Sequence, residues 1–172
     1  MPKIDIIYPV DNPYITQKFG ENPQIYARFG LKGHNGIDFG RVGNTTPVKA
    51  CDDGVVVISS YDANGYGNWI KIKHSWGESC YAHLNVRYVG VNQRVKKGQI
   101  LGLTDSTGFS TGHHLHFGIR VNPINYNNGY NGWVDPFPYL NNSKKTMYVE
   151  KSEWEKLHNE KNTYYANWKA TE

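Results

Sequence analysis

A series of short β-type segments separated by turn residues constrains the fold of this chain most strongly. Residues 69–73 (WIKIK) alternate apolar and polar side chains, which is typical of a half-buried strand. Residues 55–58 (VVVI) are β-branched and lie between the turn-forming stretches 52–54 (DDG) and 64–65 (NG). Helical periodicity is poor from residue 4 to about 140, and 18 glycines allow many tight turns. We therefore expect a mainly β fold, an antiparallel sheet or sandwich with long loops at one end.

Two later segments, 99–103 (QILGL) and 114–120 (HLHFGIR), are further candidate strands. The pattern changes after about residue 140. Ser152 and Glu155 have the spacing of a helix-capping box, and apolar residues follow at helical spacing. We expect one domain over residues 1–140 and a C-terminal amphipathic helix within 141–172. That helix either packs on the domain or connects it to another module or partner.

Composition and charge exclude several classes of protein. The net charge of +4 is mild, and no Lys/Arg cluster is dense enough to predict nucleic-acid binding. The chain contains no run of about 18 apolar residues, the length that a membrane-spanning helix requires. Residues 1–5 (MPKID) lack the apolar core of a signal peptide. Cys51 and Cys80 do not form a Cys-x-x-Cys metal pair. They are either one disulfide or two buried thiols.

Three of the seven histidines fall in one short run, 112–116 (GHHLH). Side chains two residues apart in a strand point to the same face, so His114 and His116 should project together. His113 should point to the opposite face, and we expect it not to be a metal ligand. Each histidine taken alone is more often structural than functional, and only the combination with other motifs makes this pair informative.

A second pair lies upstream. His34 and Asp38 are four residues apart, an even separation that also gives one face in an extended segment. Imidazole nitrogen and carboxylate oxygen are ligands of zinc, and a catalytic zinc needs three protein ligands and an open position. His34, Asp38 and either His114 or His116 would supply this set. The remaining imidazole and His83 would then flank a bound water and move protons during amide hydrolysis.

Four segments resemble the lysostaphin-like zinc metalloendopeptidases, which cut peptide cross-links of bacterial peptidoglycan. The segments are 33–38 (GHNGID), 81–84 (YAHL), 95–102 (VKKGQILG) and 110–117 (STGHHLHF), in the order and at the spacing of that family. The resemblance covers about residues 8 to 120. It implies the family's mainly β fold with long loops around a groove, Zn²⁺ as the cofactor, and peptidoglycan peptides as the substrate.

The resemblance also implies roles for the individual motif residues. It assigns His34, Asp38 and His116 as the zinc ligands, and His83 and His114 as the catalytic residues. No residue of these motifs is missing from the chain.

Three weaker candidates for substrate binding are Tyr26, His74 and Tyr81. Some members of the family place a tyrosine upstream of the first motif, and Tyr26 is the candidate here. His74 ends a predicted strand beside the family's groove, although a structural role is the default for it. Tyr81 belongs to a set of aromatic residues that either line the groove or pack within the sheet.

The function expected from these observations is a zinc-dependent endopeptidase that acts at the bacterial cell wall. We expect a phage origin, in which the protein is an endolysin or a tail-associated lysin. The alternative origin is a secreted bacterial hydrolase. One alternative is a wall-binding or virion structural module with the same fold and little catalysis. Another is a zinc-dependent amidase or carboxypeptidase on the same polymer. The sequence leaves the bond cut and the oligomeric state open.

Overall fold

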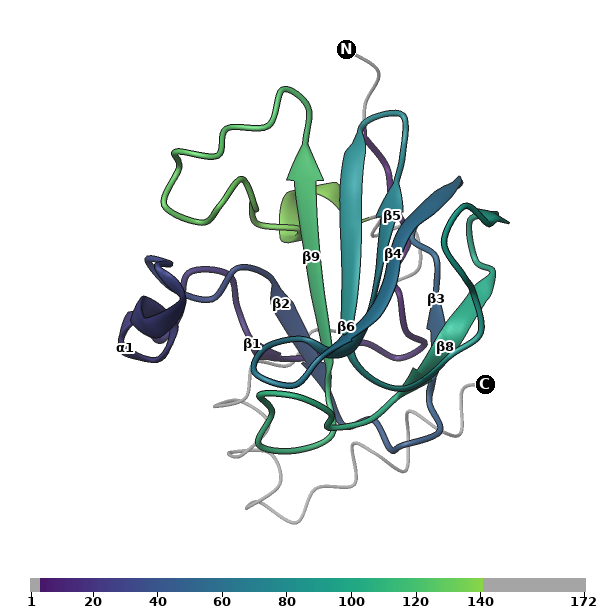
Figure 1. The fold of residues 1–172 in the computed structure, drawn as a ribbon, viewed down its shortest axis with the longest axis horizontal. Helices are drawn as coiled ribbons and strands as arrows, with labels where there is room; N and C mark the ends of the chain where they lie inside the picture. Colours follow the sequence, from purple (N-terminus) through teal and green to yellow (C-terminus); the bar gives the residue numbers. More distant parts are fainter. Residues whose placement is uncertain (1–3, 141–172) are drawn as a thin grey trace, which may run out of the picture.

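A computed structural model describes residues 4–140, which form a nine-stranded, mainly antiparallel sheet system (Figure 1). The main path through the sheet is β1-β2-β9-β6-β5-β4-β7, and β8 pairs with both β3 and β6. The strands are β1 (Tyr14–Gln17), β2 (Ile37–Gly40), β3 (Pro47–Lys49), β4 (Gly54–Asp62), β5 (Gly67–Lys73), β6 (Gly77–Arg87), β7 (Arg94–Val95), β8 (Ile100–Thr104) and β9 (Leu115–Val121). The helical turns are α1 (Pro23–Tyr26), η1 (Ala27–Phe29) and η2 (Phe137–Tyr139).

Strand β6 joins two parts of the sheet. Its first half lies between β5 and β9, and its second half pairs with β8. Figure 1 shows β9, β6, β5 and β4 side by side, with β3 and β8 displaced from them. Val48 of β3 and Leu101 of β8 belong to the same buried cluster as Phe117 of β9, so these two strands cover one face of the main sheet. The main hydrophobic core lies there and includes Phe39, Tyr81 and Phe117, all with no exposed surface.

The opposite face of the sheet carries the polar residues of interest. Tyr81 pairs with Phe117, and the next residues along, Ala82 and His116, also pair. Because side chains alternate across a strand, the first pair enters the core and the second faces the other way. The face opposite the main core therefore presents His116 on a rigid central strand.

The sequence-based expectation of a mainly β antiparallel fold is confirmed. Each of the four expected strands overlaps an observed one, namely β4, β5, β8 and β9. The expected C-terminal helix within 141–172 lies outside the described residues. Among residues 4–140 no helix has the length and apolarity that crossing a membrane requires. Cys51 and Cys80 are buried free thiols, which excludes the alternative of a disulfide.

Candidate metal centre and active site

Two adjacent strands position Asp38 and His116. Asp38 of β2 is the direct antiparallel partner of His116 of β9, so both side chains leave the same face. Nδ1 of His116 lies 3.1 Å from Oδ1 of Asp38. Both residues are buried, with 4% and 7% of their surface exposed. The two ligand candidates therefore have a fixed separation set by sheet register.

His34 reaches the same point from a loop, because β2 begins only at Ile37. The expectation that His34 and Asp38 share one extended strand is wrong, although their side chains meet. The loop is instead fixed by hydrogen bonds with the preceding segment: the His34 amide donates to Glu21 and its carbonyl accepts from Gly20. A Cβ atom at Gly33 would lie 2.3 Å from the carbonyl oxygen of Gly20, so this close approach requires glycine.

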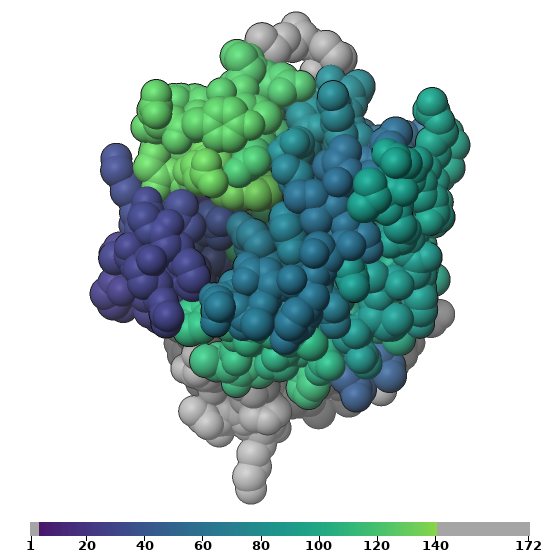
Figure 2. All heavy atoms as spheres, in the orientation of Figure 1, coloured from purple at the N-terminus to yellow at the C-terminus, as the bar shows by residue number. Residues whose placement is uncertain are grey.

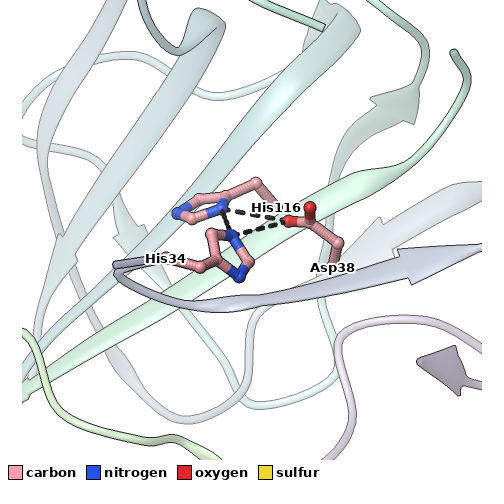
Figure 3. A group of neighbouring side chains, drawn as sticks. All are labelled: His34, Asp38 and His116. Carbon is pink, nitrogen blue, oxygen red and sulfur yellow. Dashed lines mark hydrogen bonds and ion pairs between the residues drawn. The ribbon is translucent and has the colours of Figure 1, made fainter. Parts of the chain in front are cut away.

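The three side chains converge on one point (Figure 3). Nε2 of His34 lies 2.9 Å from Nδ1 of His116 and 3.1 Å from Oδ1 of Asp38. The other ring nitrogen of His34, Nδ1, is 3.1 Å from the carbonyl oxygen of Lys18 and donates to it, which leaves Nε2 with its lone pair facing the centre. Three electron-pair donors thus face one another, an arrangement that needs a cation or protons between them.

This donor set fits zinc. Zinc bonds to His and Asp are about 2.0–2.2 Å long, so tetrahedral ligand atoms lie about 3.3–3.6 Å apart. The observed separations of 2.9 to 3.1 Å are a few tenths of an ångström shorter, so a small outward shift of the side chains would admit the ion. The Lys18 carbonyl fixes the tautomer and the ring orientation of His34, as carbonyl groups commonly do for metal-binding histidines. Two imidazoles and one carboxylate leave a fourth position for water or substrate.

His83 and His114 lie beside this centre. Their ring centroids are 4.6 Å apart, and Nε2 of His114 lies 3.7 Å from Oδ2 of Asp38. Regular alternation from Tyr81 would point His83 into the core. Its φ of +62° breaks the alternation and turns it toward His116, with ring centroids 6.1 Å apart. A non-glycine residue in this region is strained, and such strain is typical of functional sites.

Main-chain carbonyls orient both of these rings. Nδ1 of His83 donates to the Thr107 carbonyl over 2.7 Å, and Nδ1 of His114 donates to the Gly112 carbonyl over 2.8 Å. In each ring Nε2 is then the nitrogen left for chemistry. These partners cannot be recognised in the sequence, because a carbonyl oxygen carries no side-chain pattern that marks it.

Burial and neighbouring charges shift the acid–base properties of the group. Burial lowers the pKa of His83 to about 3, with further contributions from His114 and His116. Burial also lowers the pKa of His116. Burial alone would raise the pKa of Asp38, but its interactions with the neighbouring His34 and His116 rings bring it well below its usual range. At neutral pH His83 is therefore an uncharged imidazole.

The three weaker candidates for substrate binding differ in position. The ring of Tyr26 lies 5.1 Å from that of His34, and its hydroxyl donates to Gln17, so it lies beside the centre. Tyr81 is fully buried in the core, where its hydroxyl accepts from the Cys51 amide, and no surface remains for a substrate. His74 is buried and stacks on Trp76, at the end of β6 opposite to His83. Neither His74 nor Tyr81 can contact a substrate without rearrangement.

Asn35 and Tyr66 form a further pair beside the centre, and no sequence pattern links these two residues. The Asn35 side-chain amide donates to the hydroxyl of Tyr66 over 2.8 Å, and the Tyr66 ring lies 5.5 Å from that of His116. The Tyr66 carbonyl accepts from the His83 amide.

His113 is half-exposed and paired with Asp105 over 3.0 Å, away from the three converging side chains.

Comparison with known proteins places this arrangement in a family. Residues 32–129 match the family described as Peptidase family M23. The glycyl-glycine endopeptidase ALE-1 of Staphylococcus capitis is 40% identical over 116 residues, covering 64% of this chain and 30% of that protein. The DD-carboxypeptidase/endopeptidase Mpg of Neisseria meningitidis serogroup B is 36% identical over 133 residues, covering 67% of this chain and 30% of that protein.

A solved structure agrees. The catalytic domain of lysostaphin from Staphylococcus simulans superposes with a TM-score of 0.61 at 34% identity, covering 75% of this chain and 92% of that one. The chain thus spans about 30% of the length of these two curated relatives and nearly all of a catalytic domain. The family match, the fold and the converging His/Asp/His group agree, and the chain belongs to peptidase family M23, whose members are zinc metalloproteases.

Proposed function

We propose that this domain is a zinc endopeptidase that hydrolyses peptide bonds of bacterial peptidoglycan. The observation that carries the proposal is the convergence of His34, Asp38 and His116, with His83 and His114 beside them. The names of the relatives support the substrate class, because they describe glycyl-glycine and DD-peptide hydrolases. The proposed substrate is therefore a peptide of the cell wall.

In this proposal His34, Asp38 and His116 hold the metal. Bound zinc supplies Lewis acidity, which activates water toward a carbonyl carbon. His83 is neutral at pH 7 and presents Nε2, because the Thr107 carbonyl holds its Nδ1. His114 presents Nε2 on the side of Asp38. Together the two rings accept a proton from the attacking water and return one to the leaving amine, a contribution typically worth 10²–10⁴-fold in rate.

The test is digestion of purified cell walls by the full chain loaded with zinc. We expect turbidity to fall and new amino groups to appear, and we expect a chelator to abolish both effects. Binding to walls without release of amino groups would instead favour the alternative of a wall-binding or virion structural module. Mass analysis of the fragments identifies the bond cut, and release of a sugar-linked lactyl group or of terminal residues alone would favour an amidase or a carboxypeptidase.

Two broader expectations belong to the same proposal. Residues 1–140 are proposed as the catalytic domain, with 141–172 as an appendage or linker. A truncated chain ending at residue 140 that keeps full activity would support this division.

The origin as a phage endolysin or tail-associated lysin stays a prediction. Capsid or tail genes beside the gene for this chain would support it. Action at the bacterial cell wall follows from the proposed substrate.

A further inference from the structure

Strand β6 changes its partner at His83. Ala82, the residue before it, pairs with His116 of β9, and Leu84, the residue after it, pairs with Thr104 of β8. His83 therefore stands at the break between two ladders, where regular strand pairing does not set the direction of its side chain.

Strand β6 also carries one extra residue at this break. Between the pairs Ile70–Tyr81 and Asn68–Leu84 there is one residue on β5 and two residues on β6. Such a β-bulge leaves a residue out of the ladder and re-aims its side chain. The bulge and the φ of +62° together turn His83 out of the core and toward the metal centre.

The side chain of Thr107 bridges the two strands at this bulge. Its hydroxyl oxygen accepts from the Asn68 amide of β5 over 3.0 Å and donates to the Leu84 carbonyl of β6 over 2.8 Å. The main-chain carbonyl of the same residue accepts from Nδ1 of His83 over 2.7 Å. One residue thus holds both the backbone that carries His83 and the ring itself.

The loop that carries Thr107 is fixed against the tip of the β4–β5 hairpin. The Phe109 amide donates to the Gly65 carbonyl over 2.8 Å. A Cβ atom at Gly67 would lie 2.4 Å from the Thr107 carbonyl oxygen, and one at Gly108 would lie 2.3 Å from the Gly67 nitrogen. Figure 2 shows this hairpin tip and the loop of residues 105–113 side by side. The loop is therefore a fixed support, to which the Thr107 hydroxyl ties the bulge of β6.

We infer that Thr107 is a positioning residue for His83, because its hydroxyl keeps the bulge of β6 in the form that directs the imidazole at the metal centre. Valine has a similar shape and no hydroxyl. It would leave the Asn68 amide without this acceptor and the Leu84 carbonyl without one of its donors, and unmet polar groups favour rearrangement of the bulge. Displacing a catalytic group by about 1 Å can lower the rate about 10²-fold. The catalytic part of the inference rests on the proposed function and deepens it.

The test compares Thr107→Val with Thr107→Ser in the zinc-loaded full chain, on a soluble wall peptide that the wild type cleaves. T107V should lose about 10- to 100-fold in kcat with an unchanged KM, because the position of the proton-transferring ring changes. It should still bind one zinc per chain, since the hydrogen bonds of Thr107 go to Asn68, Leu84 and His83 and to no metal ligand. T107S keeps the hydroxyl and should keep most of the wild-type kcat. If T107V does not fold, T107A takes its place.

Ser59→Ala is the matched control. The Ser59 hydroxyl also joins two segments, since it donates to the Val89 carbonyl over 2.8 Å and accepts from Arg87, and neither partner belongs to the metal centre. This variant should lose stability in urea, as T107V should, but keep the kcat and KM of the wild type. A loss of stability alone is thereby separated from a loss of position.

Nitrogen NMR of the His83 ring gives a second measurement that needs no turnover. The wild type should carry the ring proton on Nδ1, which faces the Thr107 carbonyl, whereas T107V should show a mixture of both tautomers. Wild-type kcat in folded T107V or T107A, a kcat in T107S as low as in T107V, or a proton on Nε2 in the wild type would overturn the inference. A protein that shows the tautomer change but cleaves no wall peptide has the positioning without the proposed function. A protein that cleaves the peptide equally well with and without the hydroxyl has the function without the positioning.

Discussion

Substitution of Gly36 by alanine should disturb the metal centre through crowding alone. A Cβ atom at this position would lie 2.7 Å from Cε1 and 2.9 Å from Nε2 of the His116 ring, and 2.5 Å from the Phe117 carbonyl oxygen. Ordinary contact begins at 3.4 Å, so the ring would have to move by about 0.7 Å. The carbonyl belongs to strand β9 and cannot yield easily.

Two effects should follow from this displacement. Overpacking of a buried site costs about 1–3 kcal/mol in the free energy of unfolding. Metal–ligand distances tolerate only about 0.2 Å of change, so displacing a ligand ring by more than that should lower zinc affinity by at least about tenfold. Urea denaturation of the metal-free protein measures the first effect, and competition with a chelator of known affinity measures the second.

Gly43→Ala is the matched control. Gly43 is exposed, and no atom beyond its chain neighbours lies within 4 Å of a Cβ atom built there. This variant should unfold and bind zinc as the wild type does. If Gly36→Ala also kept the stability and the zinc affinity of the wild type, the argument that His116 occupies a fixed, fully packed position would be refuted.

Three further predictions concern the surroundings of the centre. His83→Ala should keep its zinc and lose about 10²–10⁴-fold in kcat, as metal analysis beside turnover would reveal; loss of zinc would instead make His83 a ligand. Gly108→Ala should lower kcat as well as stability, because Gly108 has φ +75° and follows Thr107, whose carbonyl orients His83. If kinetics and urea denaturation of this variant matched those of the wild type, the proposed link between the Gly108 backbone and the His83 ring would be rejected. Burial lowers the pKa values of His74, His83 and His116, so below about pH 6.5 the unfolded chain binds protons that the folded chain does not, and the metal-free protein should lose stability as pH falls from 7 to 5. Denaturation midpoints that stay constant or rise over this range would contradict it.

The sequence predicts the part of the site that depends on regular strand geometry. His114 directly precedes β9 and His116 is its second residue, so both are brought to one side and lie near Asp38. The period of two in residues 69–73 likewise predicts which side of β5 is buried, as Ile70 and Ile72 have no exposed surface.

The remaining features depend on contacts between distant segments. His34 meets Asp38 because its loop is hydrogen-bonded to residues 20 and 21, and not because the two share a strand. The positive φ of His83 has no sequence marker, since the residue is not glycine and sits within β6. Tyr81 has the same appearance in the sequence as a groove residue, and only the register of β6 against β9 places it in the core.

The central claim is that one metal ion is held by His34, Asp38 and His116, with His114 next to it as a catalytic group. Zinc bound per chain, measured for His116→Ala and His114→Ala, tests this most directly. We predict that His116→Ala binds no zinc at concentrations that saturate the wild type, whereas His114→Ala binds one ion per chain and lacks turnover. Loss of zinc from His114→Ala together with its retention in His116→Ala would contradict the account.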